Sequence, residues 1–315
     1  MQYRIGIDLG GTAIKAGIVD ENYQVICRHT QPSNHDFNGV IADLAATVET
    51  VAAMAGLRVS DFPCVGVGIP SSVNPKTKRL VFANNTGWRD MPLGEELEKK
   101  LSIPVYIGND ANCAVIGEAL AGAARGRDNV VMLTLGTGVG GGILLNGRLF
   151  TGGDGMGVEL GHTPLVHGGV RCTCGIEGCL EAYASVTALI RQTREAMQAH
   201  PESALHAYVA GHGGAVDGRT AFDCAQAGDP TAAAVVDQYL DYLANGIGGL
   251  ITIFRPEIFL LGGGLSAQGD NLVRPLTEKV PRYVYSSDLI GVPPIATATL
   301  GNAAGTIGAA YLDQM

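Results

Sequence analysis

The stretch Asp8-Leu9-Gly10-Gly11-Thr12, read together with the later stretch Leu135-Gly136-Thr137-Gly138, decides the fold of this chain. Each glycine turn follows an apolar strand pattern, over residues 3–8 and 130–135. Because the two glycine turns lie about a domain's length apart, they indicate duplicated domains and not a solenoid, whose repeat is roughly 20 to 50 residues long. The sequence therefore predicts two related α/β domains.

Working outward from the two turns, strand and helix periodicities alternate along the chain. Glycine and charged residues interrupt the apolar pattern at 122–128, so we expect a smaller domain over 1–121 and a larger one over 122–301. The strands are expected at 13–19, 23–30, 65–69, 104–107, 142–145 and 258–261, and the helices at 40–55, 93–101, 111–120, 185–199, 231–254 and 302–312.

Composition excludes several classes of protein. The 315 residues are 46% hydrophobic, and apolar residues are spread along the whole length, which argues against disorder. The net charge is −9 and no Lys/Arg-rich run occurs, which disfavours nucleic acid or an anionic membrane as the main partner. Neither a secretory signal nor an apolar run of about 20 residues is visible, and the seven cysteines are unevenly placed. We expect a soluble cytoplasmic protein.

The two glycine turns are candidates for binding phosphate. Glycine lets backbone N–H groups approach phosphate oxygens closely, and a carboxylate such as Asp8 beside them can hold a metal ion. One such turn alone reads best as an ordinary hairpin, but two at matching places favour a phosphate grip. Neither turn fits the P-loop or the Rossmann pattern. The candidate residues are Asp8, Gly10, Gly11 and Thr12 in the first half and Gly136, Thr137 and Gly138 in the second.

A second motif has the spacing of a metal site. His162, Cys172, Cys174 and Cys179 offer one imidazole and three thiols, which is a complete tetrahedral set for structural zinc. The alternative is a group of scattered buried cysteines with a core histidine. With four protein ligands no position stays open, so the metal is expected to brace the loop and to fix Glu159 and Glu181 at its two ends.

Polar residues also follow a predicted strand at Asn109-Asp110. Such an aspartate is often only a helix N-cap, but it can instead act as a general base, because strand ends in α/β sheets open into the ligand crevice. Asn84 lies in a loop that could be a simple turn. Amides and carboxylates gathered in this way suit a polyhydroxylated ligand, whose hydroxyls both donate and accept hydrogen bonds.

Together these motifs resemble the ROK family of sugar kinases and repressors, most of all its glucokinases. The resemblance covers nearly the whole chain, and its most specific string runs from Glu159 to Glu181. It implies a duplicated actin-like, hexokinase-type ATPase fold with a cleft between the two α/β domains. It further implies that the last helix, at about 302–315, returns to the first domain, and that the protein is a homodimer.

The resemblance also implies residue roles. Asp110 matches the catalytic base of ATP-dependent phosphorylation of a hexose at its 6-hydroxyl, with glucose as the expected substrate. Asp8 matches the carboxylate associated with Mg²⁺. Ser71 departs from the family, which has glycine there, so fructose, mannose, allose and an N-acylated amino sugar stay open. The other matching residues are Asn84, Asn109, Glu159, His162 and Glu181 for the sugar, Thr12 and Thr137 for the phosphates, and Gly262, Gly263 and Gly264 for the adenosine.

A sugar-responsive repressor of the same family is the remaining alternative. Those repressors carry a helix-turn-helix segment before the kinase-like body, whereas the first strand predicted here begins at Tyr3 and no basic patch compensates. We therefore expect an enzyme that binds ATP, Mg²⁺ and structural Zn²⁺ and does not bind nucleic acid.

Overall fold

The computed structural model describes residues 2–83 and 87–315. The chain forms two compact units, each assembled from separate stretches of sequence. Unit 1 comprises residues 1–130, 142–158 and 298–315, and unit 2 comprises residues 131–141 and 159–297.

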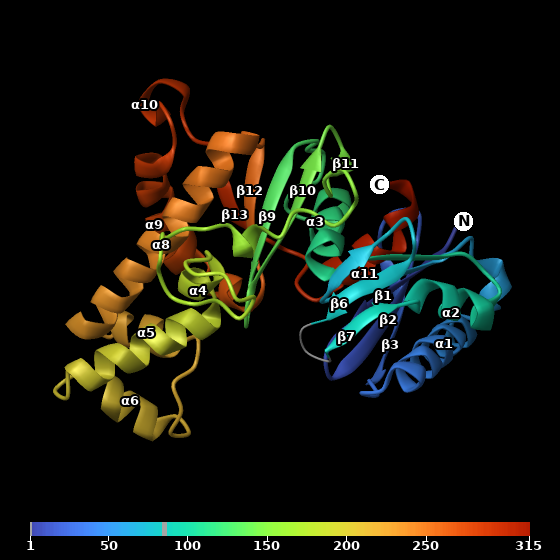
Figure 1. The fold of residues 1–315 in the computed structure, drawn as a ribbon, viewed down its shortest axis with the longest axis horizontal. Helices are drawn as coiled ribbons and strands as arrows, with labels where there is room; N and C mark the ends of the chain where they lie inside the picture. Colours follow the sequence, from blue (N-terminus) through green and yellow to red (C-terminus); the bar gives the residue numbers. More distant parts are fainter. Residues whose placement is uncertain (1, 84–86) are drawn as a thin grey trace. The chain divides into compact units, whose positions relative to one another are not determined.

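Unit 1 is built on a five-stranded sheet with the order β3-β2-β1-β4-β8 (Figure 1). β1 (Arg4–Leu9), β2 (Ala13–Val19) and β3 (Val25–Pro32) form an antiparallel meander, and β4 (Val65–Ile69) and β8 (Val105–Asn109) run parallel to β1. The same unit contains a small antiparallel sheet of β5 (Ser72–Asn74), β6 (Arg79–Ala83) and β7 (Trp88–Met91). Its further helices are α2 (Leu93–Leu101) and α3 (Asp110–Ala121).

One helix covers the core face of this sheet. α1 (Phe37–Met54) begins at Asp36, whose side chain accepts a hydrogen bond from the Gly39 N–H. α1 is the one helix of the described chain that is long and apolar enough to cross a membrane. Its buried residues, however, share a core cluster with Ile5 and Ile7 of β1, so α1 is a core helix of unit 1.

The end of the chain covers the opposite face. α11 (Ala303–Ala310) packs against α3, β1 and β4. Glycines allow this close packing: a Cβ at Gly6 would lie 1.9 Å from the Thr306 carbonyl oxygen, and one at Gly66 would lie 1.7 Å from that of Ala309. Because strand residues alternate between the two faces, β1 packs isoleucines on α1 and glycine on α11.

A buried carboxylate joins α3 to the segment that leads into α11. Glu118 is fully buried, and it accepts hydrogen bonds from the backbone N–H groups of Ala123 at 2.8 Å, Thr299 at 3.0 Å and Leu300 at 2.8 Å. Gly122 leaves room for it, because a Cβ there would lie 2.0 Å from the carboxylate.

A second five-stranded sheet repeats this strand order as β11-β10-β9-β12-β13. The strands are β9 (Val130–Leu135), β10 (Val139–Leu145), β11 (Arg148–Leu149), β12 (Ile258–Gly262) and β13 (Ile295–Thr297). In each sheet a glycine turn joins the central strand to its hairpin partner, which confirms the predicted duplication. The expected strand at 142–145 begins earlier, at Val139. The helices of unit 2 are α4 (Glu181–Ala184), α5 (Val186–Ala199), α6 (Leu205–Gly211), α7 (Thr220–Gln226), α8 (Pro230–Phe254), α9 (Asp270–Lys279) and α10 (Ser287–Ile290).

Candidate active site

Strand direction gathers the first group of predicted residues at one edge of the unit 1 sheet. β1, β4 and β8 are parallel, and their register pairs Asp8 with Gly68 and Ile69 with Asn109. Their carboxyl ends therefore lie side by side, as in other α/β sheets whose ligands bind at this edge. Asp8, the first glycine turn, Asn109 and Asp110 all belong to it.

Asn109, rather than Asp110, is the N-cap of α3. The Asn109 Oδ1 accepts hydrogen bonds from the N–H groups of Ala111 at 2.9 Å and Asn112 at 3.2 Å, while its Nδ2 donates to the Ser71 carbonyl oxygen at 3.4 Å. Asp110 is the first helical residue, and its Oδ1 accepts from the Ala111 N–H at 2.8 Å. The capping function that could have explained an aspartate here is thus performed by its neighbour.

The first glycine turn is closed by the Gly10 N–H, which donates to the Ala13 carbonyl oxygen at 2.9 Å. Gly11 and Thr12 are exposed. The Asp8 carboxylate lies 3.7 Å from the Lys15 ammonium. Burial raises the pKa of Asp8 above its ordinary value, and Lys15 opposes that shift. A buried carboxylate of this kind favours a bound cation.

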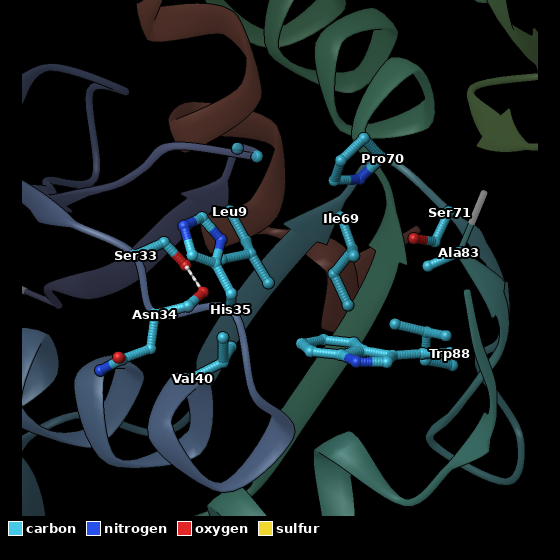
Figure 2. Close-up of a pocket in the computed structure, with 13 residues that line it drawn as sticks. Leu9, Ser33, Asn34, His35, Val40, Ile69, Pro70, Ser71, Ala83 and Trp88 are labelled. Atoms are coloured by element: carbon cyan, nitrogen blue, oxygen red, sulfur yellow. Dashed lines mark hydrogen bonds between the residues drawn. The ribbon is translucent and has the colours of Figure 1, made fainter. Parts of the chain in front are cut away.

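A pocket opens in unit 1 beside this turn (Figure 2). Its wall is mostly apolar, and in the view of Figure 2 Trp88 lies below Ile69 and to the right of Val40. Ser71 and the segment between β3 and α1 complete it, and Ser33 donates to the Asn34 carbonyl oxygen at 3.1 Å. The lining residues are Leu9, Gly10, Gly11, Ser33, Asn34, His35, Val40, Ile69, Pro70, Ser71, Leu80, Ala83 and Trp88.

In unit 2 the second glycine turn lies against the start of α5. The Val186 N–H donates to the Gly136 carbonyl oxygen at 2.9 Å, and the Thr187 hydroxyl donates to the Thr137 carbonyl oxygen at 2.7 Å. The predicted adenosine segment, Gly262 to Gly264, abuts the same turn, because a Cβ at Gly263 would lie 2.4 Å from the Leu135 carbonyl oxygen. The structure thus brings these two glycine elements together.

The four predicted metal ligands also come together in unit 2. Donor atoms of His162, Cys172, Cys174 and Cys179 all lie within 4.8 Å of one another. The Cys174 and Cys179 sulfurs are 3.6 Å apart, and the Cys172 sulfur is 3.7 Å from the His162 Nδ1. Ligands bound tetrahedrally at about 2.3 Å would be separated by about 3.7 Å, so the cluster fits zinc. Burial, followed by the neighbouring thiols, raises the pKa of Cys179 to about 12.

Glu181 connects this cluster to the glycine turn. Its Oε2 accepts a hydrogen bond from the Val139 N–H at 2.9 Å, and its Oε1 accepts from the Thr173 hydroxyl at 3.2 Å and from the Cys172 thiol at 3.4 Å. Gly138 is needed beside it, since a Cβ there would lie 2.3 Å from the carboxylate. The cysteine loop therefore positions a carboxylate at the predicted phosphate turn.

Glu159 precedes the short turn that carries His162, and its carbonyl oxygen accepts the His162 N–H at 3.0 Å. Val158 just before it has a φ of 73°, a left-handed conformation that is costly for a β-branched residue.

Sequence reasoning missed Val158, and it also missed Ser33 and His35 in the pocket, because no motif marks them. Asn84 lies outside the described residues.

The duplicated sheets with paired glycine turns place this chain in the hexokinase-type class of α/β ATPase folds, as predicted. The ROK family model matches residues 4–315, and the chain belongs to this family. It is 40% identical over 312 residues to the glucokinase of Thermotoga maritima, covering 98% of this chain and 96% of that protein.

Two further comparisons bear on the ligand. A crystal structure of a ROK family glucokinase from Streptomyces griseus in complex with glucose and AMPPNP superposes with a TM-score of 0.84, at 34% identity and 98% coverage of both chains. The chain is also 32% identical over 321 residues to the N-acetyl-D-glucosamine kinase of Pectobacterium atrosepticum, covering 98% of each.

Proposed function

We propose that this protein transfers the terminal phosphoryl group of ATP to the 6-hydroxyl of glucose. The observation that carries the proposal is the position of Asp110 at the carboxyl edge of the unit 1 sheet, the same edge that carries the Asp8 turn, in a chain that is similar over its full length to glucokinases. A carboxylate at the start of a helix can accept the proton of a hydroxyl that attacks phosphorus in line.

The other predicted residues would hold the sugar. Asn84, Asn109, Glu159 and Glu181 supply amides and carboxylates for its hydroxyls. The His162 Nδ1 faces the cysteine cluster, so its Nε2, on the other side of the ring, is the nitrogen that would meet the sugar. The zinc that we infer here would have a structural role, since its four ligands leave no open position.

The glycine turns would hold the nucleotide. Backbone N–H groups of Gly10, Gly11 and Thr12 in unit 1, and of the turn at 136–138 in unit 2, suit phosphate oxygens, and the segment at 262–264 would take the adenosine. Mg²⁺, when bound at Asp8, would neutralise charge on the transferring group. We expect a homodimer that acts in the cytoplasm.

The experiment is a sugar panel with ATP and Mg²⁺, in which ADP release is measured and the new phosphate is located on the product. Asp110→Asn should keep the fold and much of the sugar binding but lose at least about two decades of turnover. Asp61→Asn is the matched control, because that exposed aspartate only pairs with Arg58 on the surface. Near-normal turnover of Asp110→Asn would refute the assignment.

An N-acylated amino sugar is the second candidate. The similarity to an N-acetyl-D-glucosamine kinase and the apolar pocket beside Ser71 favour it. The same panel decides, because a kcat/KM that is higher for N-acetylglucosamine than for glucose would replace the first proposal with the second.

A further inference from the structure

Most backbone groups of the second glycine turn have hydrogen-bond partners inside unit 2. The Gly136 N–H donates to the Gly138 carbonyl oxygen at 3.0 Å, and the Val139 N–H donates to the Glu181 Oε2 at 2.9 Å. The carbonyl oxygens of Gly136 and Thr137 both accept hydrogen bonds from the first residues of α5. For the N–H groups of Thr137 and Gly138, the described part of the chain provides no partner.

The bonds from α5 fix the direction of these two N–H groups. Every peptide bond of the described chain is trans, and a trans peptide is planar, so its C=O and N–H point in opposite directions. The Gly136 carbonyl, held by the Val186 N–H at 2.9 Å, therefore turns the Thr137 N–H away from α5. In the same way the Thr137 carbonyl, held by the Thr187 hydroxyl at 2.7 Å, turns the Gly138 N–H away from α5.

Two consecutive N–H groups without partners suit an anion. Successive N–H groups of a turn form a small concavity that binds phosphate oxygens. Thr137 is exposed and Gly138 is half-buried, so a ligand can reach both. The next N–H, that of Val139, is already bound by the Glu181 carboxylate. The turn therefore offers two donors to a phosphate group, and α5 determines where they point.

The Thr187 hydroxyl is the one side-chain group in this arrangement that holds a carbonyl of the turn. The bond from the Val186 N–H is a backbone bond that any residue except proline could make, whereas the bond to the Thr137 carbonyl needs a side-chain donor. Thr187 is the second residue of α5 and is exposed, so the core of unit 2 does not require a threonine there. Its contact with the glycine turn accounts for the hydroxyl.

We propose that Thr187 is a positioning residue for the phosphate groups of the nucleotide. Its hydroxyl holds the Thr137 carbonyl and, through that peptide, aims the Gly138 N–H at a phosphate oxygen. The inference rests on the proposed function, because it requires the second glycine turn to bind the phosphates of ATP.

The test compares Thr187→Val with the wild-type chain. The Kd of AMPPNP with Mg²⁺ is measured by calorimetry, and KM and kcat are measured for ATP and for glucose. Thr187→Val removes the hydroxyl and keeps the shape of the side chain, so the Kd of AMPPNP and the KM of ATP should rise about tenfold, while the KM of glucose stays within about twofold. Thr187→Ser keeps a hydroxyl and should bring the Kd of AMPPNP back to within about threefold of the wild type.

Thr277→Val is the matched control. Thr277 is also an exposed threonine of unit 2, and its hydroxyl donates to the Val273 carbonyl oxygen at 2.9 Å within α9. The substitution removes a hydrogen bond of the same kind outside the glycine turn and should leave the Kd of AMPPNP unchanged. Adenosine, which contains no phosphate, should bind Thr187→Val and the wild type equally well in a competition assay.

The proposal would be overturned by an unchanged Kd of AMPPNP in Thr187→Val, by equal losses of affinity for adenosine and AMPPNP, or by a Thr187→Ser variant as weak as Thr187→Val. A wild type that binds AMPPNP without phosphorylating glucose would reject the proposed function, while the binding data would still decide the role of Thr187. A wild type with no affinity for AMPPNP would reject both.

Discussion

The buried carboxylate of Glu118 offers a direct test of how the two ends of unit 1 are held together. Glu118→Ala would remove the acceptor of three backbone N–H groups, at Ala123, Thr299 and Leu300. A buried donor left without a partner costs about 1–3 kcal/mol. Three such donors would lose their acceptor, but water can enter part of the space and reduce the cost. We therefore expect the free energy of unfolding to fall by about 4–6 kcal/mol, which is comparable with the whole stability of many proteins.

The chain provides its own probe for this measurement, because its single tryptophan, Trp88, lies in unit 1. Urea unfolding followed by Trp88 fluorescence should show the midpoint of the variant falling by about 2 M, if unfolding has a slope of roughly 2–3 kcal/mol per M. Glu118→Gln keeps one acceptor oxygen and should lose about half as much.

Glu49→Ala is the control, because Glu49 lies on the exposed face of α1 and should shift the stability by less than about 0.5 kcal/mol. If Glu118→Ala unfolds at the same urea concentration as Glu49→Ala, the reasoning about stranded donors is wrong.

The remaining predictions concern the metal sites. Metal analysis should find close to one zinc per chain, and Cys179→Ser should lose it and melt at a lower temperature, whereas Cys27→Ser should keep it; a metal-free wild type that melts unchanged would contradict the cluster's role. Burial raises the pKa of Asp8 in the folded protein, so ionising this carboxyl group destabilises the fold. This destabilisation is absent at low pH, where Asp8 is protonated, and it increases as the pH rises through the folded pKa. Asp8→Asn should therefore be more stable than the wild type at pH 7 without Mg²⁺, with the difference vanishing below about pH 4, while its turnover falls. A variant less stable than the wild type at pH 7 would refute this.

The parts of the molecule that could be predicted are those in which a local pattern forces a local structure. The cysteine spacing identified four ligands that meet in space, and the apolar periods identified the central strands. β5, β6 and β7 escaped prediction because they are only three to five residues long, and β7 contains Arg89 and Asp90. Such short, half-exposed strands resemble loops when only their composition is considered.

Other features depend on contacts between residues far apart in the chain. The run at 138–142 looks like a turn, yet β10 already begins at Val139. Its glycines are required by packing, because the Glu181 carboxylate and the α3 side chain of Val115 occupy the space that side chains at Gly138 and Gly142 would need. Glu118 and Thr299 are 181 residues apart and no spacing rule connects them. The sequence could not reveal these pairings without the fold.

The packing of α11 on β1 and β4 has a consequence for how the protein is made. The first strands leave the ribosome early, but the helix that fills the glycine-lined face of their sheet begins only at Ala303. Until α11 has been made, that face has no partner and its glycines leave it open to water. Unit 1 must therefore wait for α11 to be synthesised, and a chain truncated just before residue 303 should be a target for chaperones and proteases.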